Sequence, residues 1–180
     1  MIRKNYRHQN AEVIYTKDVI TTVNKSDIEN LHQLSIQNPR KRLRLCTHQK
    51  QNDLLHEMLI LHDKNAYVRP HKHPGKSESM HIIEGIVDLI IFNDVGQIES
   101  VINMGNYSSD KIFYYRMEVP IFHTLIIQSD LLVFQETTNG PFIKNETIFA
   151  PWSPKDSDLI AVEKYMSNLK NSLRNLKNKD

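Results

Sequence analysis

Residues 69–85 contain the side chains most able to do chemistry together. His71 and His73 are one residue apart, and Glu78 follows the Pro74-Gly75 pair. Side chains alternate along an extended strand, so His71 and His73 would point to the same side. A turn at Pro74-Gly75 would let Glu78 come back to face them. Imidazole and carboxylate ligands suit a divalent first-row metal better than Ca²⁺, so the sequence predicts a transition-metal site with one more ligand elsewhere.

A series of short strands must position these residues. β-Branched and apolar segments separated by turn residues predict strands at 54–61, 86–92, 97–102, 111–119, 121–128 and 131–136. Strands at nearly regular spacing, with no helices between them, favour an antiparallel sandwich or barrel. We therefore expect a mainly β fold.

The N-terminal third predicts less regular structure and one helix. Residues 1–12 are polar and aperiodic, which predicts a flexible segment, and residues 13–15 could form a short strand. An amphipathic pattern predicts a helix over 26–37. Ser26 and Glu29 have the spacing of a capping box at its start.

The strand expected after this helix has one polar face. From residue 42 onward, alternation groups four polar side chains: Arg42, Arg44, Cys46 and His48. If this face lines a cavity, the planar donor forks of the two arginines would suit a phosphate or carboxylate. The alternative is a solvent-facing edge strand protected from aggregation by its charges. Both interpretations remain open from the sequence.

The C-terminal residues predict a long amphipathic helix over 155–180. Ser153 would be its N-cap and Pro154 its first residue. Apolar residues recur at steps of three and four: Leu159, Val162, Met166, Leu169, Leu173 and Leu176. This stripe would pack the helix on a sheet or on a second subunit.

Composition limits the function classes. The 180 residues suit one domain, and 23 Lys and Arg against 21 Asp and Glu give a formal charge of +2. This near equality of basic and acidic residues predicts neither a nucleic-acid nor a membrane partner. The lone Cys46 allows no internal disulfide. With a polar N-terminus and no apolar run of about 20 residues, we expect a cytoplasmic protein.

The pattern of residues 71–85 resembles the first motif of the cupin superfamily, His-x-His-x₄-Glu-x₆-Gly. It is matched by His71, His73, Glu78 and Gly85, and the superfamily's second motif is similar to residues 120–123, where His123 follows a proline. The resemblance implies a cupin double-stranded β-helix, a jelly-roll barrel, over residues 13–154. It also implies a metal set of His71, His73, Glu78 and His123, with zinc, iron, manganese or nickel as the divalent ion.

A narrower resemblance covers roughly residues 13–170. Segments 67–78, 123–125, 139–141 and 149–154 look like the WbuC family of cupin-fold metalloproteins. That family implies a small metalloprotein, often encoded among bacterial surface-polysaccharide genes, with no settled reaction. By resemblance to cupins we also expect a homodimer. The chain departs from the second motif where Pro120 stands in place of a glycine near the histidine.

Three hypotheses for the function follow, and the residues do not decide whether the protein is an enzyme. The first is a metal-dependent isomerase or epimerase acting on a small polar or anionic molecule, a sugar or nucleotide sugar by family association. The second is an Fe(II)-dependent dioxygenase, and the third is a non-catalytic cupin that binds a small ligand. No catalytic residue is assigned. The candidates for contacting a substrate are Arg42, Arg44, Arg69, Lys76 and Glu136.

Overall fold

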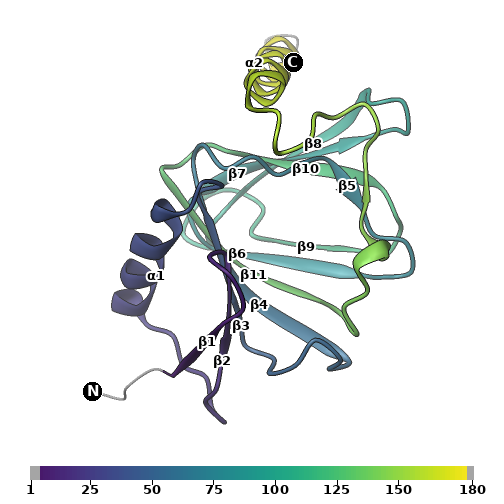
Figure 1. The fold of residues 1–180 in the computed structure, drawn as a ribbon. Coiled ribbons are helices and arrows are strands. Elements are labelled where there is room, and N and C mark those ends of the chain that lie inside the picture. The colour runs from purple at the N-terminus through teal and green to yellow at the C-terminus, as the bar shows by residue number, and fades with distance from the viewer. Residues whose placement is uncertain (1–4, 178–180) are drawn as a thin grey trace.

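The computed structural model describes residues 5–177, apart from the side chains of Lys144 and Lys177. Its strands form two sheets (Figure 1). The larger has, in spatial order, β1 (Tyr6–His8), β2 (Val13–Thr16), β3 (Arg42–Cys46), β4 (Leu55–Asp63), β11 (Leu131–Asn139), β6 (Glu78–Glu84) and β9 (Tyr114–Met117). The smaller has β12 (Ile148–Phe149), β5 (His71–Lys72), β10 (Phe122–Ile127), β7 (Ile86–Phe92) and β8 (Ile98–Gly105). Neighbouring strands are antiparallel except β2 and β3.

Alternation along the strands produces an inner core between the sheets. On β4, Ile60 joins a buried cluster with Phe134 of β11, and with Leu89 and Leu125 of the smaller sheet. The two sheets therefore face each other across one apolar core. The result is the mainly β jelly-roll barrel that the sequence predicted.

Both helices cover outer faces of the barrel. Helix α1 (Lys25–Gln37) packs Leu31 against the outward residues of the larger sheet, such as Leu61. Helix α2 (Leu159–Lys177) packs Leu169 and Leu173 over the outer face of the smaller sheet. Figure 1 shows the two helices on different sides of the barrel. Neither helix is long and apolar enough, within the described part of the chain, to cross a membrane.

The glycine of the first motif is required by the backbone at the turn from β6 to β7. Gly85 has φ +95°, and a Cβ atom there would lie 2.4 Å from the carbonyl oxygen of Leu131. Because φ is left-handed here and a backbone oxygen lies so close, only glycine fits at this position without a rearrangement. The turn lets β6, which carries Glu78, lead directly into β7 of the opposite sheet.

Part of the N-terminal segment that the sequence predicts to be flexible forms a strand. Residues 6–8 form β1, which pairs with β2. The guanidinium of Arg7 stacks on the ring of Tyr15 and also donates to the carbonyl of Gln49. Pairing across the chain thus orders residues whose local pattern is polar. Residues 1–4 lie outside the described part.

The helix starts also differ from the sequence prediction. Asn24, not Ser26, caps α1, because its side chain accepts from the backbone N–H of Asp27 while Asp27 accepts from that of Asn24. Helix α2 begins at Leu159, with the Asp158 side chain accepting from the backbone N–H of Ala161.

Ser153 is engaged elsewhere and cannot cap α2. Its hydroxyl donates to the carbonyl of Ala150 and accepts from Arg69 Nε. Pro154 presents its carbonyl to the Tyr67 hydroxyl. These bonds hold residues 150–154 in a tight loop, so the helix starts later than predicted.

Candidate metal centre

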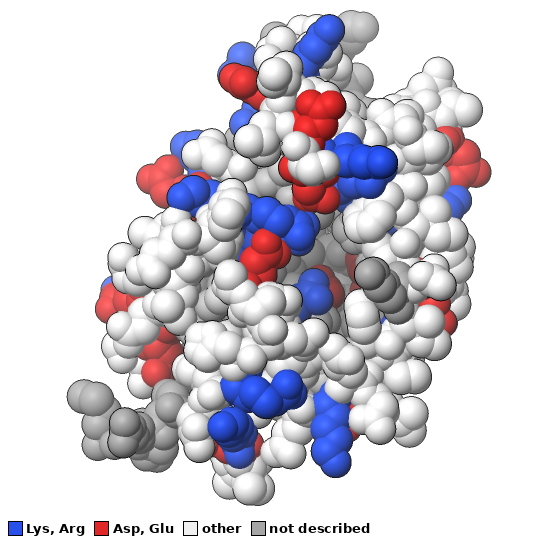
Figure 2. All heavy atoms as spheres, viewed as in Figure 1, with Lys and Arg blue, Asp and Glu red and all other residues white. Residues whose placement is uncertain are grey.

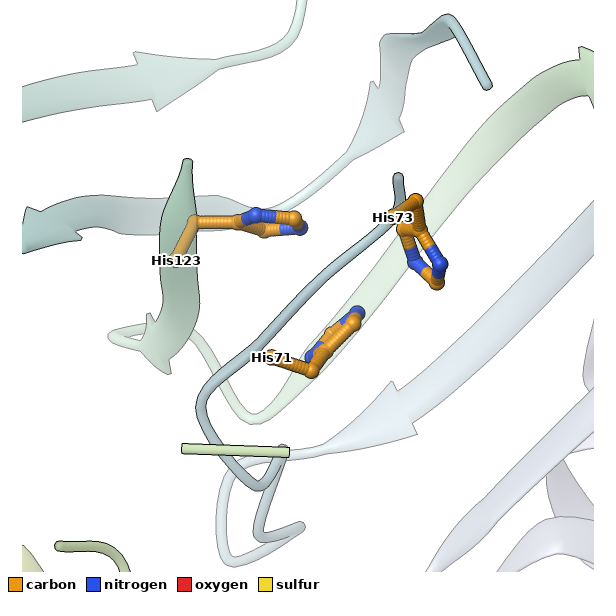
Figure 3. Close-up of side chains that lie close together, drawn as sticks. All are labelled: His71, His73 and His123. Carbon is orange, nitrogen blue, oxygen red and sulfur yellow. The ribbon is translucent and has the colours of Figure 1, made fainter. Parts of the chain in front are cut away.

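Three histidines converge from two adjacent strands of the smaller sheet. His71 on β5 is the register partner of His123 on β10, and His73 follows directly after β5. Figure 3 shows the three rings turned toward a common centre. One ligand atom from each lies within 4.8 Å of the others. The structure therefore brings together three of the four predicted metal ligands at a distance that one ion can bridge.

Each ring is oriented through its Nδ1 atom. Nδ1 of His71 lies 2.8 Å from the carbonyl oxygen of Arg69, and Nδ1 of His123 lies 2.9 Å from that of Ile121. Nδ1 of His73 lies 3.3 Å from the hydroxyl of Thr147. A carbonyl can only accept, so it fixes the proton on Nδ1 and leaves the Nε2 lone pair of His71 for a ligand.

The fourth predicted ligand, Glu78, stands beside this group. Its Oε1 is 3.2 Å from Nε2 of His123, and its Oε2 is 3.6 Å from Nε2 of His73. The Tyr115 hydroxyl donates to Oε1 at 2.8 Å. Glu78 thus faces the same nitrogen atoms that a cation would use, and its role as a ligand stays a prediction.

Electrostatics leave two imidazoles neutral and the carboxylate charged. Burial, together with the neighbouring histidines, lowers the pKa of His71 to about 3, and burial also lowers the pKa of His73. Burial opposes charge on Glu78, but the hydrogen bond and charge of His123 lower its pKa to about 2. Burial likewise opposes charge on His123, yet the hydrogen bond and charge of Glu78, together with the carbonyl of Ile121, outweigh it and raise the pKa.

This donor set fits a divalent first-row transition ion. Neutral imidazoles and a carboxylate are its preferred ligands, and among the described residues no cysteine belongs to the cluster to favour a softer ion. His123 would give up its proton on binding, because a cation would replace the proton as the partner of Nε2 and Glu78. The described residues thus form a candidate metal site whose ion is not specified.

The site opens onto a cavity of about 530 Å³ between the two sheets. This volume is in the range of small-molecule sites. Its wall includes the three histidines, Glu78 and Glu136. Figure 2 shows this face of the molecule hollowed near its middle, with basic and acidic side chains intermingled around it.

Three of the five predicted substrate contacts line the cavity but already have partners. Arg42 Nε donates to Glu12 Oε2 at 2.9 Å. Arg69 bonds to the loop at residues 150–153 and stacks on Phe149. Lys76 Nζ donates to the carbonyl of Pro141 and lies 3.1 Å from Glu146 Oε2. Their role toward a substrate stays a prediction.

The other two predicted contacts have no such partner. Among the residues that the structure describes, neither the Arg44 nor the Glu136 side chain makes a hydrogen bond or ion pair, and both line the cavity. Burial raises the pKa of Glu136 to about 7, with Arg44 opposing and Glu78 adding to the shift. Both side chains are therefore free to meet a ligand.

Sequence reasoning missed two cavity histidines of β4, His56 and His62. His56 stacks on His48, with ring centroids 4.0 Å apart. The alternation of His56, Met58, Ile60 and His62 on β4 was the available signal. It was masked because the opposite side of this strand, covered by α1, is apolar as well.

Comparisons with known proteins give little beyond this geometry. A domain of unknown function, DUF6016, matches residues 23–104, which is less than half of the chain and ends before His123. No curated protein sequence matches. The resemblance to the WbuC family therefore stays a prediction.

Several solved structures are similar at low identity. A mutant of Bacillus subtilis oxalate decarboxylase is 16% identical over 54% of this chain and 24% of its own length, with a TM-score of 0.44. A Shewanella oneidensis protein is 7% identical over 67% of this chain and 75% of its own length, with a TM-score of 0.47. Procruciferin, an 11S globulin of Brassica napus, is 13% identical over 66% of this chain and 24% of its own length, with a TM-score of 0.40. This chain thus spans about a quarter of the decarboxylase and of the globulin.

Proposed function

We propose that this protein is a metal-dependent enzyme of the isomerase or epimerase type that acts on a sugar or nucleotide sugar. The observation that carries the proposal is the convergence of His71, His73 and His123 at the wall of a cavity of small-molecule size. A divalent ion held there would supply Lewis acidity toward a carbonyl or hydroxyl oxygen of the substrate.

The chain's own residues supply the proton transfer. Isomerisation or epimerisation removes a proton from one carbon and returns it to the same or a neighbouring carbon. Glu136 faces the cavity without a hydrogen-bonding partner in the described residues. A carboxyl group whose pKa lies near ambient pH can both take and return a proton. We assign this step to Glu136.

The biological setting rests on resemblance alone. The segments similar to the WbuC family suggest a role in bacterial surface-polysaccharide metabolism, and sugars are the substrates expected there. The cavity's polar lining, which combines arginine, histidine and carboxylate groups, is compatible with a hydroxylated molecule.

The metal site is tested by replacing His123 with alanine and measuring bound metal by elemental analysis. We expect His123→Ala to lose most of the metal that the unmodified protein carries, because one of three converging nitrogen atoms disappears. His81→Ala is the matched control, since His81 is exposed on the opposite side of β6. Equal metal content in the His123→Ala variant and the unmodified protein would refute the site.

The reaction type is tested by incubating the metal-loaded protein with aldose and ketose sugars in D₂O. We expect deuterium to enter a carbon-bound position, visible by NMR, and Glu136→Gln to slow that entry at least a hundredfold while retaining the metal. Consumption of dioxygen without deuterium exchange would instead identify the dioxygenase. Binding without either change would identify a ligand-binding cupin.

A further inference from the structure

Arg44 is the one arginine of the cavity wall whose side chain has no bonding partner among the described residues. Arg42 is bonded to Glu12, and Arg40 is bonded to Asp156 at 3.1 Å. Arg44 has neither a hydrogen bond nor an ion pair within the described part of the chain, although it lines the same cavity and is half-buried. A guanidinium in this situation is a ready partner for an anion, because its planar fork matches a carboxylate or phosphate.

His62 adds an unsatisfied polar atom next to this arginine. It lies on β4 opposite Arg42, two residues from Ile60, which is the register partner of Arg44. It lines the cavity with only 6% of its surface exposed. Its Nδ1 atom has no hydrogen-bond partner among the described residues. Buried polar atoms are rarely left unpaired, so this ring of the cavity wall has hydrogen-bonding capacity that no described residue uses.

These two residues lie apart from the metal candidate. The histidine triad belongs to the smaller sheet and its adjoining loop, whereas Arg44 and His62 belong to β3 and β4 of the larger one. Glu136 lies between these two residues and Glu78 in the larger sheet, because its strand β11 pairs with β4 on one side and with β6, which carries Glu78, on the other. The polar groups of the cavity thus run from the triad, past Glu136, to Arg44 and His62.

We propose that Arg44 and His62 form an anion subsite, which binds the carboxylate or phosphate group of a hydroxylated substrate whose other end faces the histidine triad. The substrate class is then a sugar acid or a sugar phosphate rather than a neutral sugar. This inference rests on the proposed function for the orientation of the substrate. The subsite itself depends only on the residues of β3 and β4.

The subsite is tested by isothermal titration calorimetry of the protein as purified, with gluconate, glucose 6-phosphate and glucose as probes. We expect at least one anion to bind ten times more tightly than glucose, and the tighter anion identifies carboxylate or phosphate. Arg44→Gln should weaken that anion at least tenfold, and His62→Leu at least threefold. Arg116→Gln is the matched control, because Arg116 is exposed on β9 and paired with Glu118.

Two further variants keep the outcome decisive. Arg44→Lys retains the charge and should recover part of the anion affinity, so a folding defect in Arg44→Gln would not hide the effect. His71→Ala should lose metal yet keep the preference for the anion over glucose, which separates the subsite from the metal site. If the unmodified protein binds no anion more tightly than glucose, or if both Arg44 variants bind it equally well, the subsite is refuted. If the unmodified protein binds the anion but holds no metal, the proposed metal-dependent enzyme is refuted and the anion subsite is not.

Discussion

At the level of single residues, Glu78 connects the metal candidate to the rest of the barrel. Its carboxylate faces Nε2 of His123 and His73, and it accepts a hydrogen bond from Tyr115. Burial, with the charge of Glu78, raises the pKa of Tyr115 well above its ordinary value, so the phenol keeps its proton and remains a donor. Tyr115 therefore holds the carboxylate in one orientation toward the imidazoles.

Removing the Tyr115 hydroxyl should weaken metal binding without removing a ligand. We expect Tyr115→Phe to lower metal affinity by about tenfold or more, as loss of a supporting hydrogen bond commonly does. The measurement is competition with a chelator of known affinity. Tyr114→Phe is the matched control, because Tyr114 is the neighbouring residue and points outward. Equal affinities for the two variants would mean that the carboxylate needs no such support.

The sequence was informative about residues whose spacing alone implies chemistry. His71 and His73 are one residue apart, and a strand period of two places them together whatever surrounds them. His123 needed the resemblance to a second motif, because its partner strand lies about fifty residues away. The contact of Tyr115 with Glu78 and the unsatisfied Nδ1 of His62 depend on strand register and ring orientation, which local patterns do not encode.

At the level of elements, the start of α1 is set by a reciprocal pair of hydrogen bonds. The Asn24 side chain accepts from the backbone of Asp27, and the Asp27 carboxylate accepts from the backbone of Asn24. Ser26 donates its hydroxyl to the Asn24 side chain and caps no backbone group. Leu31, one turn further along, then packs against the sheet.

This arrangement predicts different effects for two neighbouring substitutions. Asn24→Ala should lower the free energy of unfolding by about 1 kcal/mol, the usual effect of losing an N-cap. Ser26→Ala should change it by less than about 0.5 kcal/mol, as surface substitutions usually do. Chemical denaturation of both variants gives the comparison. A larger loss for Ser26→Ala would restore the capping box that the sequence first suggested.

Element types were predictable because alternation is local, whereas element ends were not. The strand expected at 86–92 is β7, with the same bounds, because Gly85 precedes it and the turn residues Asn93 and Asp94 follow it in the sequence. Strand β11 runs three residues beyond its predicted end, because β4 and β6 pair with it on both sides as far as Thr138. Ser153 has the sequence of a cap, but Ala150 and Arg69 take up its hydroxyl.

At the level of the whole molecule, the barrel buries several histidines in a neutral state. His62 is the clearest, because burial lowers its pKa to about 3, and the charges of Arg44 and Arg40 add to the shift. Its other neighbours are Arg42, across from it on β3, and the ring of Phe134 on β11. No described carboxylate is paired with it that would stabilise a protonated imidazole.

Acid should therefore destabilise the fold through His62. In the unfolded chain this histidine takes up a proton below its ordinary pKa of 6.5, whereas in the folded state it stays neutral down to about 3. The unfolded state binds more protons in this window, so stability is complete above pH 6.5 and falls as the pH drops toward 3. The contribution of one such group is at most about 1.4 kcal/mol per pH unit.

The variant His62→Gln isolates this contribution, because glutamine keeps a polar side chain but does not titrate. Urea denaturation between pH 7 and pH 4, with a chelator present throughout, gives the free energy of unfolding of both proteins. We expect the unmodified protein to lose stability more steeply than His62→Gln over this range, whatever their difference at pH 7. Parallel curves would mean that His62 accepts a proton in the folded state, and that water or a side-chain movement reaches its Nδ1 atom inside the barrel.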